Sequence, residues 1–299
     1  MTGNATIASD TDDSTGGDQD DSTAGDTDGF FGFLAGLYAA ALLAPAVAIW
    51  VALRVSGDPG VLYFVILGTA VVVTSGVGWV ARRESFAIRL GASRWVWAVM
   101  VVPFGYFGVL PAVADGRSGD PPGVVGIALV GAIAGLFVGI GLVVAARNRR
   151  AKAALAGSEK LATFTAPAPE RDRRMVTRAV AGLFAVGILA VVGSAVLDFP
   201  PLRWLFQVLV PAGPALYGST TSRRVTVSDA GLVVGNPVSK QFRPWTAYES
   251  YDVTDDALVL RRAGWSLWGL RDLRRDPADI EDPEAVAAAL DELLPRREA

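Results

Sequence analysis

The first two thirds of the chain alternate between long apolar runs and short polar connections. A helix needs about 20 predominantly apolar residues to cross a hydrocarbon core that is roughly 30 Å thick. Runs of this length occur at residues 30–53, 61–81, 95–114, 123–146, 179–197 and 201–218. The pattern therefore predicts an α-helical polytopic membrane bundle of six transmembrane helices over residues 30–218.

The sixth run differs from the others because Arg203 lies near its start and Pro211 and Pro214 interrupt it, which predicts a kinked helix. No Asp, Glu, Lys or Arg occupies the middle third of any of the six runs. Proton relays and ion-coupled transporters normally need ionisable side chains inside the membrane. Their absence from these positions disfavours coupled transport.

Basic residues between the apolar runs predict the orientation of the chain. The connections after the second and fourth runs together carry thirteen Lys and Arg residues, whereas the remaining connections carry three. Short cytoplasmic loops of membrane proteins carry an excess of basic residues. We therefore expect a multi-pass protein of the cell membrane with both connections, and both termini, in the cytoplasm.

The longest connection, residues 147–178, changes character along its length. It begins with RNRRAKAALAGSEK, which predicts a helical continuation of the fourth apolar run. It then passes through TAPAPERDRR, where the prolines favour an extended linker.

After residue 218 the hydrophobic period shortens to two, which is typical of strands. RRVTVS alternates, Asp229–Gly231 supplies a turn and LVV restarts a strand, so this segment predicts a β-hairpin. A second hairpin is expected from Tyr248–Val253 and Ala257–Arg262, with Asp255 and Asp256 at its turn, and a later strand at Trp265–Leu270.

A short helix is expected to close the chain. Asp282 suits its N-cap and Pro283 its first turn, and one face carries apolar side chains. These apolar residues are Val286, Leu290, Leu293 and Leu294. Residues 219–299 therefore predict a small cytosolic antiparallel β domain with a C-terminal helix.

Four segments of this region resemble the bacterial and archaeal pleckstrin-homology-like domains, including the YcxB-like type: VTVSDAGLVV, FRPWTAYESYDV, DDALVLRR and DPEAVAAALDELL. The resemblance covers residues 219–295. It implies a curved antiparallel sheet packed by a C-terminal helix, a docking or binding role, and no catalytic residues. The first hairpin turn, SDAG, lacks the basic residues of phosphoinositide-binding members, so specific inositol-phosphate binding is not expected.

Composition narrows the classes of function. Hydrophobic residues make up 52% of the 299 residues, and neither Cys nor His occurs. Disulfides, thiolate nucleophiles, imidazole bases and the usual zinc and copper ligands are therefore excluded. No nucleophile and base constellation or phosphate-cradling Gly-Lys loop is present, so the sequence predicts a non-enzymatic protein without a cofactor or metal.

Acidic residues dominate both ends of the chain. Residues 1–29 hold eight aspartates and no Lys or Arg, which predicts a disordered acidic tail. The sequence pI of about 5.1 and the scarcity of lysine resemble the proteins of halophilic archaea. From residue 218 onward the chain has 14 acidic and 11 basic residues, which disfavours nucleic-acid binding.

Two candidate interaction surfaces emerge. The first combines apolar and basic side chains that either press against the membrane or inner loops, or form a core strand with a solvated flank. It consists of Arg261, Arg262, Trp265, Trp268, Arg271, Arg274 and Arg275. The second is the stripe Gly131, Gly135 and Gly139, which suits close helix packing, either between two copies in a homodimer or within one bundle.

Two hypotheses of function follow. In the first, the membrane bundle anchors a pleckstrin-homology-like domain that docks a protein partner or senses membrane lipids at the surface. In the alternative, the bundle transports a substrate or handles lipid, and the C-terminal domain regulates it.

Overall fold

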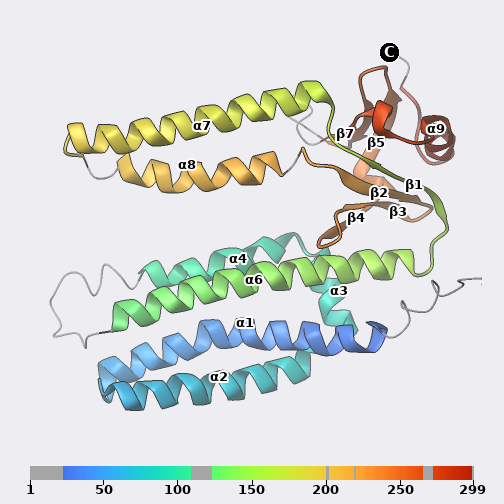
Figure 1. Cartoon of the computed structure of the whole chain (residues 1–299). Helices are drawn as coiled ribbons and strands as arrows, with labels where there is room; N and C mark the ends of the chain where they lie inside the picture. Colours follow the sequence, from blue (N-terminus) through green and yellow to red (C-terminus); the bar gives the residue numbers. More distant parts are fainter. Residues whose placement is uncertain (1–22, 109–122, 200–201, 219, 265–271, 298–299) are drawn as a thin grey trace, which may run out of the picture. The chain divides into compact units, whose positions relative to one another are not determined.

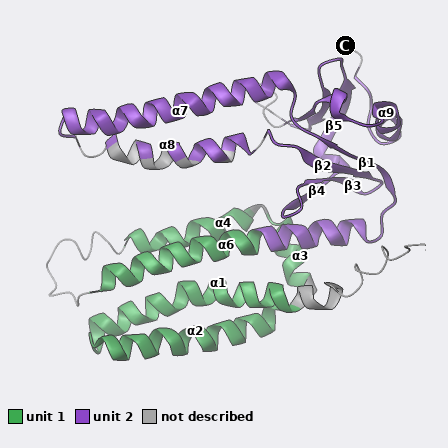
Figure 2. Ribbon diagram, in the orientation of Figure 1, with its two compact units in different colours: residues 1–143 green, residues 144–299 purple. Residues whose placement is uncertain are grey.

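The computed structural model describes residues 23–108, 123–199, 202–218, 220–264 and 272–297. The chain divides into two compact units, residues 1–143 and 144–299 (Figure 2). The boundary falls within one helix, α6 (Val124–Leu155), and each unit is described below by itself.

The first unit is helical. It contains α1 (Thr23–Arg54), α2 (Pro59–Ala81), α3 (Glu84–Ala92), a short segment of mixed helix (η1, Arg94–Trp97; α4, Ala98–Val101; η2, Val102–Gly108) and the first part of α6. Gly32 and Gly36 of α1 face Gly78 and Thr74 of α2, and a Cβ at Gly36 would lie 2.3 Å from the Thr74 carbonyl oxygen. The two helices therefore form a hairpin whose backbones touch through glycine (Figure 1). α1 begins within the predicted acidic tail, and residues 1–22 lie outside the described residues.

Four helices in the described ranges are long and apolar enough to cross a membrane: Gly29–Arg54, Pro59–Ala81, Val124–Leu155 and Glu170–Val196. They confirm the first, second, fourth and fifth predicted spans. Many of their large apolar side chains face outward, and Phe64, Val72 and Trp79 are each more than 70% exposed. Such faces are compatible with a membrane protein, because lipid tails cover apolar side chains without cost.

The predicted third and sixth spans take other forms. Ser85–Ala92 and Trp95–Gly108 meet at a 98° bend, as a broken span or a re-entrant loop does. Ser93 starts the second part by accepting a hydrogen bond from the Trp95 amide, and the run beyond Gly108 lies outside the described residues.

The sixth run forms α8 (Leu202–Tyr217), whose 16 residues extend about 24 Å. The predicted total of six is thus not confirmed: the described ranges hold four spans, or five if the bent pair counts as one.

The second unit combines a helical hairpin with two antiparallel sheets (Figure 1). The hairpin consists of α7 (Glu170–Val196) and α8, which pack where Gly187 meets Phe206 and Val210. Sheet A has the order β1-β2-β3-β4, and sheet B has the order β5-β6-β7. Their strands are β1 (Lys160–Ala166), β2 (Arg223–Ser228), β3 (Gly231–Gly235), β4 (Lys240–Pro244), β5 (Tyr248–Val253), β6 (Leu258–Arg262) and β7 (Leu273–Arg275). The short η3 (Trp245–Ala247) lies between β4 and β5, and η5 (Pro277–Asp279) and α9 (Pro283–Asp291) follow β7.

Both predicted hairpins are confirmed, as β2–β3 and β5–β6. The predicted helix is confirmed as α9, where the Asp282 carboxylate accepts a hydrogen bond from the Ala285 amide at 2.9 Å. The strand expected at Trp265–Leu270 lies outside the described residues.

Sheet A takes its first strand, β1, from the connection between α6 and α7, for which the sequence predicts a helical extension and an extended linker. The helical extension is confirmed as far as Leu155. Beyond it, β1 pairs antiparallel with β2, from Lys160 opposite Ser228 to Ala166 opposite Arg223. The β domain is therefore discontinuous in sequence, since α7 and α8 lie between its first two strands.

The core of the β domain lies between the two sheets and α9. Sheet A contributes Phe164, Val225 and Leu232, sheet B contributes Leu260 and Leu273, and α9 contributes Leu290. Tyr251 of β5 is fully buried at its centre, and its hydroxyl donates a hydrogen bond to the Asp291 carboxylate. The helix thus joins the sheets through both apolar and polar contacts.

The hydroxyl of Tyr251 makes a pH-dependent contribution to stability. Burial, and then the hydrogen bond and charge of Asp291, raise the pKa of Tyr251 from 10.0 to about 12. The folded state therefore favours the neutral phenol, and this stabilisation is complete below pH 10 and is lost as the pH rises to 12. We expect Tyr251→Phe to lower the unfolding free energy by about 1 kcal/mol at neutral pH.

Thermal unfolding of both proteins from pH 8 to 12 measures this effect. The difference between them is expected to shrink above pH 10, because the wild-type hydroxyl then ionises in the unfolded chain first. A difference that stays constant over this range would contradict the assignment.

Candidate functional site

The structure distributes the basic residues of the predicted interaction surface over both faces of sheet B. Arg274 lies opposite Val259 on the outer face, and Arg261 lies two residues further along the same strand as Val259. Arg261 lies 4.0 Å from the Asp252 carboxylate, and Arg274 lies 3.4 Å from Asp172 of α7. These two side chains therefore have acidic neighbours and do not form a free basic patch.

The other members of that surface lie elsewhere. Arg275 belongs to the opposite face, toward the core, and is only 3% exposed. Arg262 shares that face by strand alternation, and its amide donates to the Asp272 carboxylate at 3.0 Å. Trp265, Trp268 and Arg271 lie outside the described residues.

The glycine stripe of α6 lies against residues of the same chain. A Cβ at Gly131 would lie 3.0 Å from Pro45, one at Gly135 would lie 3.0 Å from Pro103, and one at Gly139 would lie 3.1 Å from the Tyr38 ring. The stripe thus receives side chains of α1 and η2 within the first unit. Homodimerisation through this stripe stays a prediction, because the structure contains one copy of the chain.

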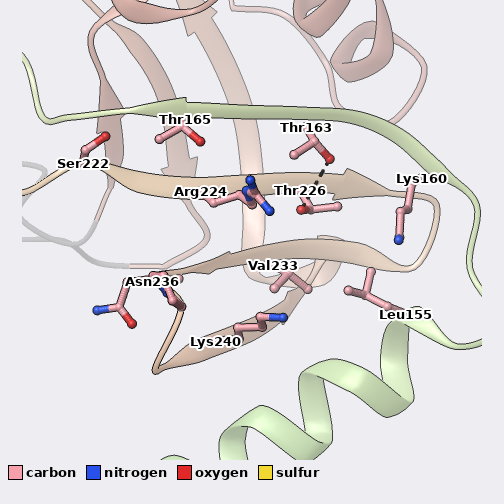
Figure 3. A pocket seen from close by; sticks show the side chains of 12 residues that line it. Leu155, Lys160, Thr163, Thr165, Ser222, Arg224, Thr226, Val233, Asn236 and Lys240 are labelled. Carbon is pink, nitrogen blue, oxygen red and sulfur yellow. Dashed lines mark hydrogen bonds between the residues drawn. The ribbon is translucent and has the colours of Figure 1, made fainter. Parts of the chain in front are cut away.

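An open pocket of about 670 Å³ lies on the outer face of sheet A (Figure 3). Its floor follows from the register of the strands, because directly paired residues of an antiparallel sheet share a face. Thr163, Thr226 and Val233 form one cross-strand row. Thr165, Arg224, Gly235 and Lys240 form the next row on the same face.

Gly235 is required at this floor by the turn that follows it. A Cβ there would lie 2.3 Å from the Ser239 carbonyl oxygen and 2.7 Å from the Cα of Lys240. Within the turn, the Asn236 carboxamide oxygen accepts hydrogen bonds from the amides of Val238 and Ser239. The Asn236 Nδ2 group remains as a donor at the edge of the pocket, which Asn236 lines.

The end of α6 holds the β3–β4 turn in place beside the pocket. Asn148 donates from Nδ2 to the Val238 carbonyl at 2.8 Å and accepts from the Lys240 amide at 2.6 Å. Two residues further on, the Arg150 guanidinium lies 5.8 Å from the centre of the Phe242 ring. Leu155, at the last residue of α6, lines the pocket. The pocket is therefore built jointly by the sheet and by the helix that continues from the fourth apolar run.

The pocket has a distinct electrostatic character. Lys160, Arg224 and Lys240 line it with exposed cations, and none of its lining residues is acidic. Below these cations lie the buried Val233 and the Thr163 and Thr226 hydroxyls, which are 3.5 Å apart. Thr163 donates this long hydrogen bond to Thr226, so the Thr226 hydroxyl keeps its donor, and both oxygens keep acceptor capacity for a ligand. The complete lining is Leu155, Lys160, Thr163, Thr165, Ser222, Arg224, Thr226, Val233, Gly235, Asn236, Pro237 and Lys240.

A larger pocket of about 910 Å³ lies where α7 begins, but its charges compensate one another. Its lining includes five carboxylates and four arginines. Among these, Glu170 pairs with Arg174 and Asp172 pairs with Arg274. Paired charges at an exposed site have little residual attraction for an ionic ligand. The pocket on sheet A is therefore the stronger candidate for a binding site.

Sequence reasoning missed the pocket on sheet A. The alternation of RRVTVS places Arg224 and Thr226 on one strand face, and this signal was available in the sequence. The partners of that face come from β1 and from the end of α6, which no local pattern connects to β2. In the described part of the chain, no group of three or more Asp and Glu residues is arranged to hold a metal ion.

Comparison of the chain with protein-family models, with curated proteins and with solved structures gives no significant match. The resemblance to pleckstrin-homology-like domains therefore stays a prediction. The protein combines long apolar helices, compatible with a membrane protein, with an antiparallel β domain that bears a basic pocket.

Proposed function

We propose that the chain is a non-enzymatic multi-pass protein of the cell membrane whose cytoplasmic β domain is a sensing module of the pleckstrin-homology-like type. The pocket on sheet A is the site where this module binds an anionic small molecule that also has an apolar part. The observation that carries the proposal is the set of three cations around a pocket with no acidic lining residue.

The shape and chemistry of the pocket support this class of ligand. Its volume of about 670 Å³ lies within the usual range of small-molecule sites. Exposed cations at the rim attract an anionic group, and the hydroxyls of the floor orient it by hydrogen bonds. Val233, Leu155 and Pro237 offer apolar surface to the rest of the molecule.

The position of the pocket supports a sensing role rather than simple storage. A ligand in the pocket contacts Leu155 of α6 as well as the strands. Because Asn148 also ties the β3–β4 turn to α6, an occupied pocket stabilises the joint between this helix and the sheet. The positive-inside distribution of Lys and Arg supports a cytoplasmic position for this joint.

Calorimetric titration of the full-length chain, in neutral detergent at low ionic strength, tests the proposal with phenyl phosphate as the probe. We expect saturable binding to the wild type and a loss of at least tenfold in affinity for Arg224→Gln/Lys240→Gln, because two charge-assisted contacts are removed. Raising the ionic strength is expected to weaken binding, since the cations are exposed.

Two controls make the result specific. Arg297→Gln removes another exposed arginine of the same domain, outside the pocket, and is expected to keep the wild-type affinity. Phenol, which keeps the ring but lacks the charge, is expected not to bind measurably. Equal affinities for the wild type and the double variant would reject the pocket as the site.

A further inference from the structure

A second group of arginines lies on the core side of the β domain. Arg223 is paired with Ala166, and Arg243 is paired with Leu232, so both belong to the core face of sheet A. Arg275 is paired with Leu258 on the core face of sheet B. The side chains of Arg223 and Arg243 lie close enough to Arg275 for their charges to repel its guanidinium.

Arg275 is buried without an acidic partner among the described residues. Its side chain is 3% exposed, and its Nη1 donates to the carbonyl oxygen of Arg274 at 3.2 Å. Its Nε is buried and has no hydrogen-bond partner in the described part of the chain. Burial first, and then the charges of Arg223 and Arg243, lower the pKa of Arg275 to about 10, so the guanidinium is still a cation at neutral pH.

Two neighbouring groups are also incompletely satisfied. The Nε of Arg243 is buried without a partner, although its Nη2 donates to Gln241 at 3.0 Å. The hydroxyl of Tyr248 is buried beside the side chain of Arg243, which is placed to donate a hydrogen bond to it, and lies near Arg275, so its own proton remains available to a ligand. Burial raises the pKa of Tyr248, so this hydroxyl keeps its proton and is a donor at neutral pH.

An unpaired cation in a protein interior is destabilising, and additional cations beside it increase the destabilisation. An anion that accepts hydrogen bonds from these groups removes this destabilisation, because it satisfies the donors and balances the charge. Arg223 and Arg243 are only half-buried, so the group is reached from solvent on that side.

The surroundings of the group point to the membrane surface. Arg223 donates from Nη2 to the carbonyl oxygen of Gly218, which directly follows the end of α8. Arg147, the first basic residue after the apolar run of α6, lies within electrostatic range of Arg243. The end of α8, and the point in α6 where its apolar run gives way to basic residues, thus lie beside these arginines, where phosphate headgroups of a bilayer are expected.

We propose that Arg223, Arg243, Arg275 and Tyr248 form a second binding site, which takes a phosphate group. The three guanidinium groups offer only donors, the Tyr248 hydroxyl donates as well, and guanidinium forks match the oxygen geometry of phosphate. The phosphate belongs either to a lipid headgroup or to a free ion, which the experiment below distinguishes. This site lies on the opposite face of sheet A from the proposed ligand pocket, and its existence does not depend on that pocket.

The test is thermal unfolding of the full-length chain in neutral detergent, with two probes added separately. One probe is inorganic phosphate, compared with chloride at equal ionic strength, and the other is phosphatidic acid, compared with phosphatidylcholine. Stabilisation by phosphate identifies a site for the free ion, and stabilisation by phosphatidic acid alone identifies a lipid site. If neither probe stabilises the protein more than its control, the proposal is overturned.

Variants separate a binding role from a structural one. Arg275→Met removes the buried charge at similar volume, so we expect its melting temperature without probe to equal or exceed that of the wild type, and its response to the probe to disappear. Arg243→Gln, at a half-buried position, is expected to weaken the stabilisation by phosphate or phosphatidic acid. If Arg275→Met does not fold, this variant alone tests the binding role. Unchanged responses of these variants would overturn the proposal.

Arg224→Gln/Lys240→Gln is the matched control on the other face of sheet A. We expect this variant to keep the wild-type response to phosphate or phosphatidic acid, even where phenyl phosphate no longer binds. The proposal for the pocket on sheet A and the proposal for the phosphate site can therefore be rejected independently of each other.

Discussion

Gly36→Ala is expected to lower the melting temperature of the protein strongly, because it separates α1 from α2. The new Cβ would lie 2.3 Å from the Thr74 carbonyl oxygen and 3.0 Å from the Gly78 amide nitrogen. Both atoms belong to the backbone, so no side-chain rotation relieves the overlap. Overpacking of this kind costs about 1–3 kcal/mol or more, which exceeds the roughly 1 kcal/mol that Ala gains over Gly in a helix.

The measurement is the fraction of monodisperse protein that survives heating in neutral detergent. Gly76→Ala is the matched control, because it makes the same substitution at a helical glycine of α2. At this position no neighbouring atom lies within 4 Å of the new Cβ. We expect the control to be neutral or slightly stabilising. Equal melting temperatures for the two variants would contradict a backbone contact between α1 and α2 at Gly36.

Phe164→Ala is expected to destabilise the β domain by about 3–5 kcal/mol, although residue 164 precedes the two helices α7 and α8. Phe164 is 6% exposed and packs in the core with Val225 and Val234. Its removal leaves a cavity beneath an edge strand, which weakens the pairing of β1 with β2. Hydrogen exchange of the β2 and β3 amides in the full-length chain measures the loss of protection.

Thr165→Ala is the control, because Thr165 is the next residue of β1 and faces outward. We expect its amide protection to match the wild type within error. Unchanged protection in Phe164→Ala would mean that the domain folds without β1. The same argument predicts that removal of residues 219–299 leaves the apolar face of β1 without a partner, so this truncation affects more than the C-terminal segment.

Much of the local structure was predictable because it depends on neighbouring residues. The length of each apolar run predicts a membrane-spanning helix, and the four longest described helices confirm this part of the prediction. The alternation in RRVTVS and the turn at Asp229–Gly231 predict the β2–β3 hairpin without reference to the rest of the chain. The Asp282 cap is likewise a contact between near neighbours.

The candidate sites depended on contacts between distant residues. Strand alternation predicts that Arg224 and Thr226 share a face, but only the pairing of β1 with β2 across α7 and α8 adds Thr163 and Thr165 to it. Alternation also separates Arg274 from Arg275, so the predicted basic surface divides between an outer face and the core. The sequence by itself determined the apolar helices, the hairpins and the absence of Cys and His chemistry, since these follow from composition and local period. The tertiary structure alone decided which cations face a common pocket, because strand register and helix docking bring together residues that no local pattern connects.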